Sequence, residues 1–281
     1  MSVLAVQLNH PGSEKSFKKG NGYSYYNNQL IREWNNDKYH YRKFIRLQGK
    51  YISAFDSEPI NDELLFWGEW EGNSWFQELP GINPNGIHRP FHSSHIHGHQ
   101  NTDPYVYGEQ FYYAICKQRG QLTKLDVGSI ILFGSSFKEG FVLDTVFVVD
   151  RHETAHEVAA KGGMNYSNTY REATLEQLAY FYANPEPDSP IKLYSGKMHN
   201  DKQQPFSYVP CKPYNEENAK GFKRVIFPYE TINDLQFSSN PTGIKIIGLG
   251  NEVTKNLWNQ ITNEVLKQGF SLGIFFNEPQ Y

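Results

Sequence analysis

Only two of the 281 residues are cysteines, Cys116 and Cys211, which excludes a disulfide-rich scaffold and favours a reducing compartment. No stretch approaches the roughly 20 consecutive apolar residues of a membrane helix, and no Lys or Arg precedes the short apolar run at the N-terminus. The formal net charge is −3, so the chain does not have the excess of basic residues that is typical of nucleic-acid-binding domains. We therefore expect a cytoplasmic protein without a signal peptide or a membrane partner.

Aromatic residues, by contrast, are abundant: the chain has 19 Tyr, 19 Phe and 5 Trp. Most of these rings are expected to fill a core, with their polar tips at its edge. Rings exposed in a cleft would instead stack on sugars or bases. The sequence contains enough rings for both roles.

Short apolar runs between turn residues predict a β-rich fold. Residues 129–137 and 141–149 are almost continuously apolar, which is typical of central strands covered on both faces. Helices are predicted at 151–161, at 174–184 with Thr174 as a possible cap, and at 251–268 before Gly269. No linker or repeat divides the chain, so we expect a single α+β domain over 1–281, built around a β-rich central sheet.

The string His152-Glu153-Thr154-Ala155-His156 has the spelling H-E-x-x-H. On a helix, His152 and His156 would hold zinc on one face, with Glu153 as general base and Glu176 as a third ligand. Charged residues flank the string, however, and it begins just after an apolar strand, where a helix would only be starting. We favour a solvated helical turn over a zinc site.

A second candidate metal site is rich in histidine. Five of the ten His residues fall within residues 88–99: His88, His92, His95, His97 and His99. In an extended segment the last three would share one face, as metal ligands do. The alternative is a polar loop whose imidazoles contact solvent, substrate or phosphate. We favour the loop and expect no metal or other cofactor.

Carboxylates next to aromatic rings are candidates for acid–base chemistry. They are Glu69, Glu71, Asp103 and Asp144. Asp144 lies in the most apolar run of the chain, where a carboxylate is unfavourable unless it is paired or functional. An ion pair for Asp144, and a solvated strand edge for Glu69 and Glu71, are the structural alternatives.

Several strings together resemble one bacterial and phage-associated protein family. They are NHPGSE, HYRKFI, FWGEWE, NTDPYVYG, GSIILFGS and LDTVFVV, and they span about residues 9–150. The family is linked with nucleotide-modification and anti-phage loci, and its closest functional association is a DNA glycosylase that excises α-glucosylated hydroxymethylcytosine. LNHPG also resembles the first motif of uracil-type DNA glycosylases, and LDVGSIILFG resembles the entry strand of PUA-like barrels.

The resemblance implies hydrolysis of the N-glycosidic bond of a modified cytosine in double-stranded DNA, as part of phage defence. One carboxylate would stabilise the oxocarbenium-like state and position water. The base would leave the helix and enter a pocket that offers stacking surfaces and hydrogen-bond donors. Candidate substrate contacts are Trp67, Trp70, Tyr105, Asn101, His10 and Asn9. Candidate contacts with the DNA backbone are Arg42, Lys43, Arg46, Lys18 and Lys19.

Two other functions fit the sequence. One is a zinc-dependent hydrolase that uses His152, Glu153 and His156. The other is a non-catalytic reader of modified bases on a PUA-like barrel. The sequence leaves open which carboxylate reacts, which base is recognised and which oligomeric state forms.

Overall fold

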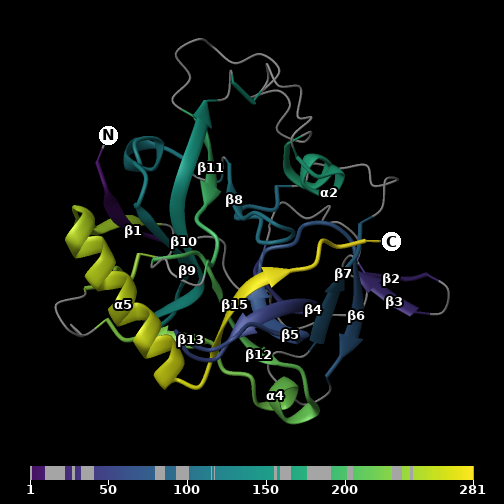
Figure 1. Ribbon diagram of the computed structural model, residues 1–281. Coiled ribbons are helices and arrows are strands. Elements are labelled where there is room, and N and C mark those ends of the chain that lie inside the picture. Colours follow the sequence, from purple (N-terminus) through teal and green to yellow (C-terminus); the bar gives the residue numbers. More distant parts are fainter. Residues whose placement is uncertain are drawn as a thin grey trace.

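The computed structural model describes most of the chain (Figure 1). The described residues are 2–9, 23–26, 29–32, 41–79, 86–92, 101–114, 116, 118–154, 157–158, 166–175, 191–200, 205–229, 236–240 and 243–280. Over these ranges, no helix has both the length and the apolar character needed to cross a membrane.

The described residues form two sheets, and the first has seven strands in the order β14–β1–β9–β10–β11–β8, with β13 paired to β10. Its strands are β1 (Leu4–Asn9), β8 (Tyr112–Tyr113), β9 (Ile130–Ser136), β10 (Phe141–Thr154), β11 (Lys192–Gly196), β13 (Val225–Phe227) and β14 (Ile244–Leu249). The predicted central strands are confirmed, because β9 lies between β1 and β10, and residues 141–149 of β10 are all buried.

The second sheet has eight strands in the order β15–β12–β5–β4–β7–β6–β3–β2. Its strands are β2 (Tyr23–Tyr26), β3 (Gln29–Arg32), β4 (Lys43–Ile52), β5 (Ile60–Gly68), β6 (Ser74–Glu78), β7 (Gly86–Pro90), β12 (Val209–Pro213) and β15 (Ser271–Phe276). Because β15 also pairs with β4, the strands β4, β5, β12 and β15 close into a ring. The PUA-like string leads into β9, in the other sheet.

Helix α5 (Asn251–Lys267), the longest among the described residues, confirms the prediction at 251–268. Its apolar residues recur every three or four positions, so that Leu257, Trp258, Ile261 and Val265 are buried on one face. Gly269 follows with φ +77°, a backbone conformation that favours glycine after a helix. The other helical segments are η1 (Gly120–Thr123), α2 (Asn168–Tyr170), η2 (Arg171–Leu175) and α4 (Glu216–Gly221).

The helix predicted at 151–161 is wrong at its start. Residues 151–154 continue strand β10 and pair with β11, where His152 lies opposite Tyr194. The helical residues begin later, at 157–158. Thr154 and Glu157 exchange hydrogen bonds between their side chains and backbone amides, as the residues of a capping box do. The strand continues because β11 satisfies its backbone groups, which a helix start would leave unpaired.

The helix predicted to begin at Thr174 begins earlier. Ser167 is the N-cap, and its side chain accepts a hydrogen bond from the Tyr170 amide. Thr174 lies within η2 and its Oγ1 donates to the Thr102 carbonyl at 3.0 Å. Serine is among the strongest N-cap residues, which explains the earlier start. Residues 176–184 lie outside the described part of the chain.

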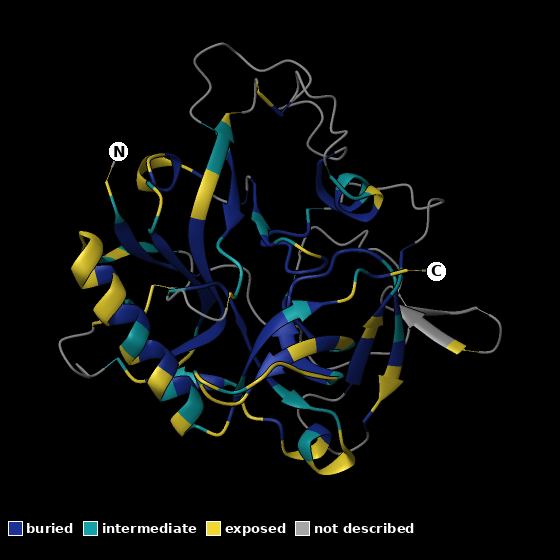
Figure 2. Cartoon of the chain, viewed as in Figure 1, coloured by how far each residue is buried: buried dark blue, intermediate teal, exposed yellow. Residues whose placement is uncertain are grey.

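The two sheets share their apolar core, and the strands at the centre of the molecule are largely buried (Figure 2). One hydrophobic cluster contains Phe66 from β5 together with Phe133 from β9. A second cluster joins Phe44 from β4 to Val146 from β10, and α5 closes it with Trp258. Together these observations confirm the predicted α+β class with a β-rich centre.

Candidate functional site

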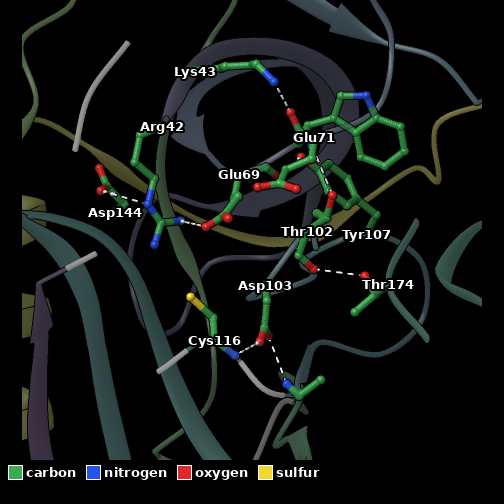
Figure 3. A network of polar contacts seen from close by, with 12 residues as sticks. Arg42, Lys43, Glu69, Glu71, Thr102, Asp103, Tyr107, Cys116, Asp144 and Thr174 are labelled. Atoms are coloured by element: carbon green, nitrogen blue, oxygen red, sulfur yellow. Dashed lines mark hydrogen bonds and ion pairs between the residues drawn. The ribbon is translucent and has the colours of Figure 1, made fainter. Parts of the chain in front are cut away.

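A buried ionic cluster lies between the two sheets (Figure 3). Arg42 has its Nη1 3.7 Å from Glu69 Oε2 and its Nε 3.6 Å from Asp144 Oδ2, and none of these three side chains is exposed. Asp144 also accepts a hydrogen bond from Nε of Arg224 at 3.1 Å. Each charge in the cluster thus lies beside a charge of opposite sign.

Two more carboxylates, Asp103 and Glu71, lie next to this cluster (Figure 3). Both accept hydrogen bonds from backbone amides. Asp103 accepts from the Cys116 amide at 2.6 Å, and Glu71 accepts from the Asn101 amide at 2.7 Å. Burial raises the pKa of the Cys116 thiol well above its ordinary value, and Glu69 and Asp103 raise it further. The thiol therefore stays protonated among these carboxylates.

The structure thus brings the four predicted catalytic carboxylates into one region, although they come from separate parts of the sequence. Their exposed fractions are 1% for Glu69, Asp103 and Asp144, and 5% for Glu71. None of them lines the cavity of about 670 Å³ that is described below. Asp144 borders a second hollow, which has no room for a water molecule. Their contacts with arginines and backbone amides are those of groups that hold the fold together.

The predicted stacking residues pack inside the protein. Trp67 lies 4.6 Å below the Arg224 guanidinium and is 8% exposed. Trp70 is fully buried, and its Nε1 donates to the Asn73 carbonyl at 2.8 Å. Tyr105 is also fully buried, although its hydroxyl reaches a cavity-lining side chain. Stacking on a substrate needs an accessible ring face, which these burial values do not provide.

Of the three predicted polar substrate contacts, two lie in the described part of the chain and bind other parts of the protein. Asn9 donates from Nδ2 to the carbonyls of Ser238 and Asn240, at 3.2 and 2.6 Å, and so ties β1 to a distant loop. Asn101 is half-buried beside Glu71. His10 lies outside the described residues.

The predicted DNA-backbone cations lie in protected places. Arg42 is fully buried in the ionic cluster, and the Lys43 ammonium donates to the Trp70 carbonyl. Arg46 pairs with Glu63 at 2.5 Å and stacks on the Tyr214 ring at 3.3 Å. A phosphate contact requires an accessible cation, which Arg42 and Lys43 are not. Lys18 and Lys19 are outside the described residues.

Neither candidate metal site forms among the described residues. His152 and Glu153 are neighbours on strand β10, so their side chains point to opposite faces, and the H-E-x-x-H string does not lie on one helix. His88 bonds to Ser74 at 2.8 Å, and His92 pairs with Glu172 at 2.6 Å. The described ranges hold no group of three potential metal ligands. His95, His97, His99, His156 and Glu176 lie outside these ranges.

An open cavity of about 670 Å³ lies where the two sheets meet, near the C-terminal end of β15. Its volume is typical of small-molecule sites, which measure about 300–1,000 Å³. The lining combines aromatic, amide and acidic side chains: Tyr107, Glu109, Gln110, Tyr112, Ser167, Phe275, Asn277, Glu278 and Gln280, with Gly108.

Glu278 is the carboxylate that the protein orients in this cavity. The Tyr105 hydroxyl donates to Glu278 Oε1 at 3.0 Å, and the Ser167 hydroxyl contacts the same oxygen. Burial, followed by the Glu278 charge, raises the pKa of Tyr105 well above its ordinary value. Tyr105 therefore stays protonated as a donor, and half-buried Glu278 is held at a fixed angle.

A tight turn sets the position of Glu278. Tyr105 and Tyr112 exchange two backbone hydrogen bonds of 2.9 Å, and the Gly108 amide binds the Phe276 carbonyl of β15 at 2.8 Å. Gly108 has φ +79°, and a Cβ on it would lie 2.9 Å from Glu278 Oε1. Only glycine fits this place without displacing the carboxylate.

Sequence reasoning missed Glu278 because the residues that orient it are distant in the chain. Tyr105 and Glu278 are 173 positions apart. The available signal was the string FFNEP near the C-terminus, which places an acid beside two rings as FWGEWE does. The string gives no information about the cavity that it borders.

No protein-family model, no curated protein and no solved structure matches this chain.

Proposed function

We propose that this protein hydrolyses the N-glycosidic bond of a glucosylated cytosine in phage DNA, with Glu278 as the catalytic carboxylate. The observation that carries this proposal is a carboxylate fixed by two hydroxyl groups in an open cavity of about 670 Å³. Catalysis would then take place at Glu278 and not at the buried carboxylates Glu69, Glu71, Asp103 and Asp144.

The chemistry needs one ionised carboxylate beside the sugar. As the bond between C1′ and the base nitrogen breaks, the base takes the bonding electron pair and the sugar becomes oxocarbenium-like. Glu278 would stabilise that positive charge and accept a proton from the water that adds to C1′. The departing base takes up one proton from solvent and Glu278 returns one proton to solvent, so the products are a free base and an abasic sugar.

The lining of the cavity suits an extruded nucleotide. Phe275 is a half-buried ring that can stack on a pyrimidine or on the apolar face of a glucose. Tyr112 is also half-buried and lines the cavity, and its ring stacks on Tyr170 at 4.4 Å between centroids. Gln110, Asn277 and Gln280 supply donors and acceptors for hydroxyl groups and for the base edge. The free thiols of Cys116 and Cys211 are consistent with a cytoplasmic location, where defence against phage DNA would take place.

Base release is testable on a defined DNA duplex with a single glucosylated hydroxymethylcytosine. We expect alkali to cleave the strand at that position after incubation with the protein, and an unmodified duplex to stay intact. A chelator should leave the rate unchanged, because the candidate residues act without a metal. Loss of cleavage with chelator would favour the zinc hydrolase, and binding without cleavage would favour a non-catalytic reader.

Gly108→Ala tests how Glu278 is positioned. A new Cβ would lie 2.9 Å from Glu278 Oε1, so we expect the carboxylate to shift and the rate of base release to fall by about 100-fold. Gly269→Ala is the matched control, since it has a similar φ of +77° and nothing within 4 Å of the added atom. Equal rate losses in the two variants would show that backbone strain alone is responsible.

A further inference from the structure

A row of three side chains runs from one side of the cavity across the first sheet to an exposed arginine. Tyr112 of β8 lies opposite Ser195 of β11, and Ser195 lies opposite Arg151 of β10. Directly opposite residues in antiparallel strands point to the same face, so the three side chains form a row. Nε of Arg151 donates to Ser195 Oγ at 3.3 Å, which directs the guanidinium along this row.

The other side of the cavity leads to an exposed lysine in the same way. Phe275 of β15 lines the cavity and lies opposite Lys50 of β4. The Lys50 ammonium lies 5.4 Å from the centre of the Phe275 ring. The cavity therefore has one cation beyond Tyr112 and another beyond Phe275.

We propose that Arg151 and Lys50 bind phosphates of the DNA strand on the two sides of the nucleotide that enters the cavity. This inference rests on the proposed function. Glu109 and Glu278 make the cavity itself acidic, so a phosphate is repelled from its interior and attracted to its rim. A neutral base and sugar can therefore enter the cavity while the charged DNA backbone stays outside it.

Arg151 and Lys50 are both accessible to a phosphate. Both are exposed, and neither forms an ion pair within the described residues. Arg46, Lys220 and Lys267, by comparison, are each paired with a glutamate. A phosphate at either proposed position would not have to displace a protein carboxylate.

The test is the salt dependence of DNA binding by the full chain. The dissociation constant for the glucosylated duplex is measured by fluorescence anisotropy at several salt concentrations, with Glu278→Gln in all proteins to prevent turnover. Each lost phosphate contact should reduce the slope of log K against log salt by about 0.9. We expect this reduction for Lys50→Ala and for Arg151→Ala, and about twice the reduction for the double variant.

Lys255→Ala is the matched control, because Lys255 is exposed on α5, which contributes no residue to the cavity. An unchanged slope in both single variants, with base release by the parent protein intact, would overturn the inference and leave the proposed function standing. The expected slopes without any base release would instead support a DNA-binding surface and contradict the glycosylase.

Discussion

Glu278→Gln should lower the rate of base release by about 100- to 10,000-fold, the range expected when a positioned acid–base group is lost. The amide keeps the shape of the side chain and can still accept hydrogen bonds from Tyr105 and Ser167. It cannot balance positive charge on the sugar or take a proton from water. Single-turnover kinetics on the glucosylated duplex measure this loss without interference from product release.

Two comparisons make the Glu278 result specific. The thermal midpoint of Glu278→Gln should stay close to that of the parent protein, because the side chain is half-buried and keeps its shape. Glu109→Gln removes the other cavity-lining carboxylate, which is exposed, and should reduce the rate much less. If Glu109→Gln abolished base release and Glu278→Gln did not, the catalytic role would belong to Glu109.

Asp144→Ala should reduce the free energy of unfolding by about 3–5 kcal/mol, the usual effect of removing one partner from a buried ion pair. Asp144 lies between Arg42 and Arg224, and its loss leaves both guanidinium groups without this carboxylate in a region that excludes water. Since small proteins have only about 5–15 kcal/mol of stability, much of the total depends on this contact. Urea unfolding followed by tryptophan fluorescence measures the change.

Asp150→Ala is the control for this effect, because Asp150 is an exposed aspartate on the same strand β10. We expect a change below about 0.5 kcal/mol there, as is usual for surface substitutions. A normally stable Asp144→Ala protein that had lost base release would restore Asp144 as a catalytic candidate. That outcome would contradict the structural role of the ionic cluster.

The sequence predicts the parts of the fold whose signals are local and periodic. Residues 141–149 of strand β10 form a nearly continuous apolar run, and α5 repeats apolar residues every three or four positions, so both elements are predictable. The extension of β10 through His152 depends on pairing with β11, about 40 residues later, and no local pattern encodes that pairing. The H-E-x-x-H string by itself therefore predicts a helix start where the structure has a strand.

The candidate site could be predicted only in part. Acidic residues that stand next to aromatic residues in the sequence identify Glu69, Asp103 and Asp144, and the fold does bring these three together. Their burial, however, depends on how the two sheets meet. Glu278 becomes a candidate only when the turn at Gly108 and the end of β15 lie side by side. Such long-range contacts determine which of several carboxylates faces a cavity.

The most direct measurement is mass spectrometry of the small molecules released from phage DNA that carries glucosylated hydroxymethylcytosine. We predict the intact glucosylated base, in amounts equal to the abasic sites formed, and no release from unmodified DNA. Release of free glucose, with hydroxymethylcytosine left in the strand, would show that the cavity cleaves a different glycosidic bond. Release of nothing would contradict the assignment of catalysis to Glu278 and its cavity.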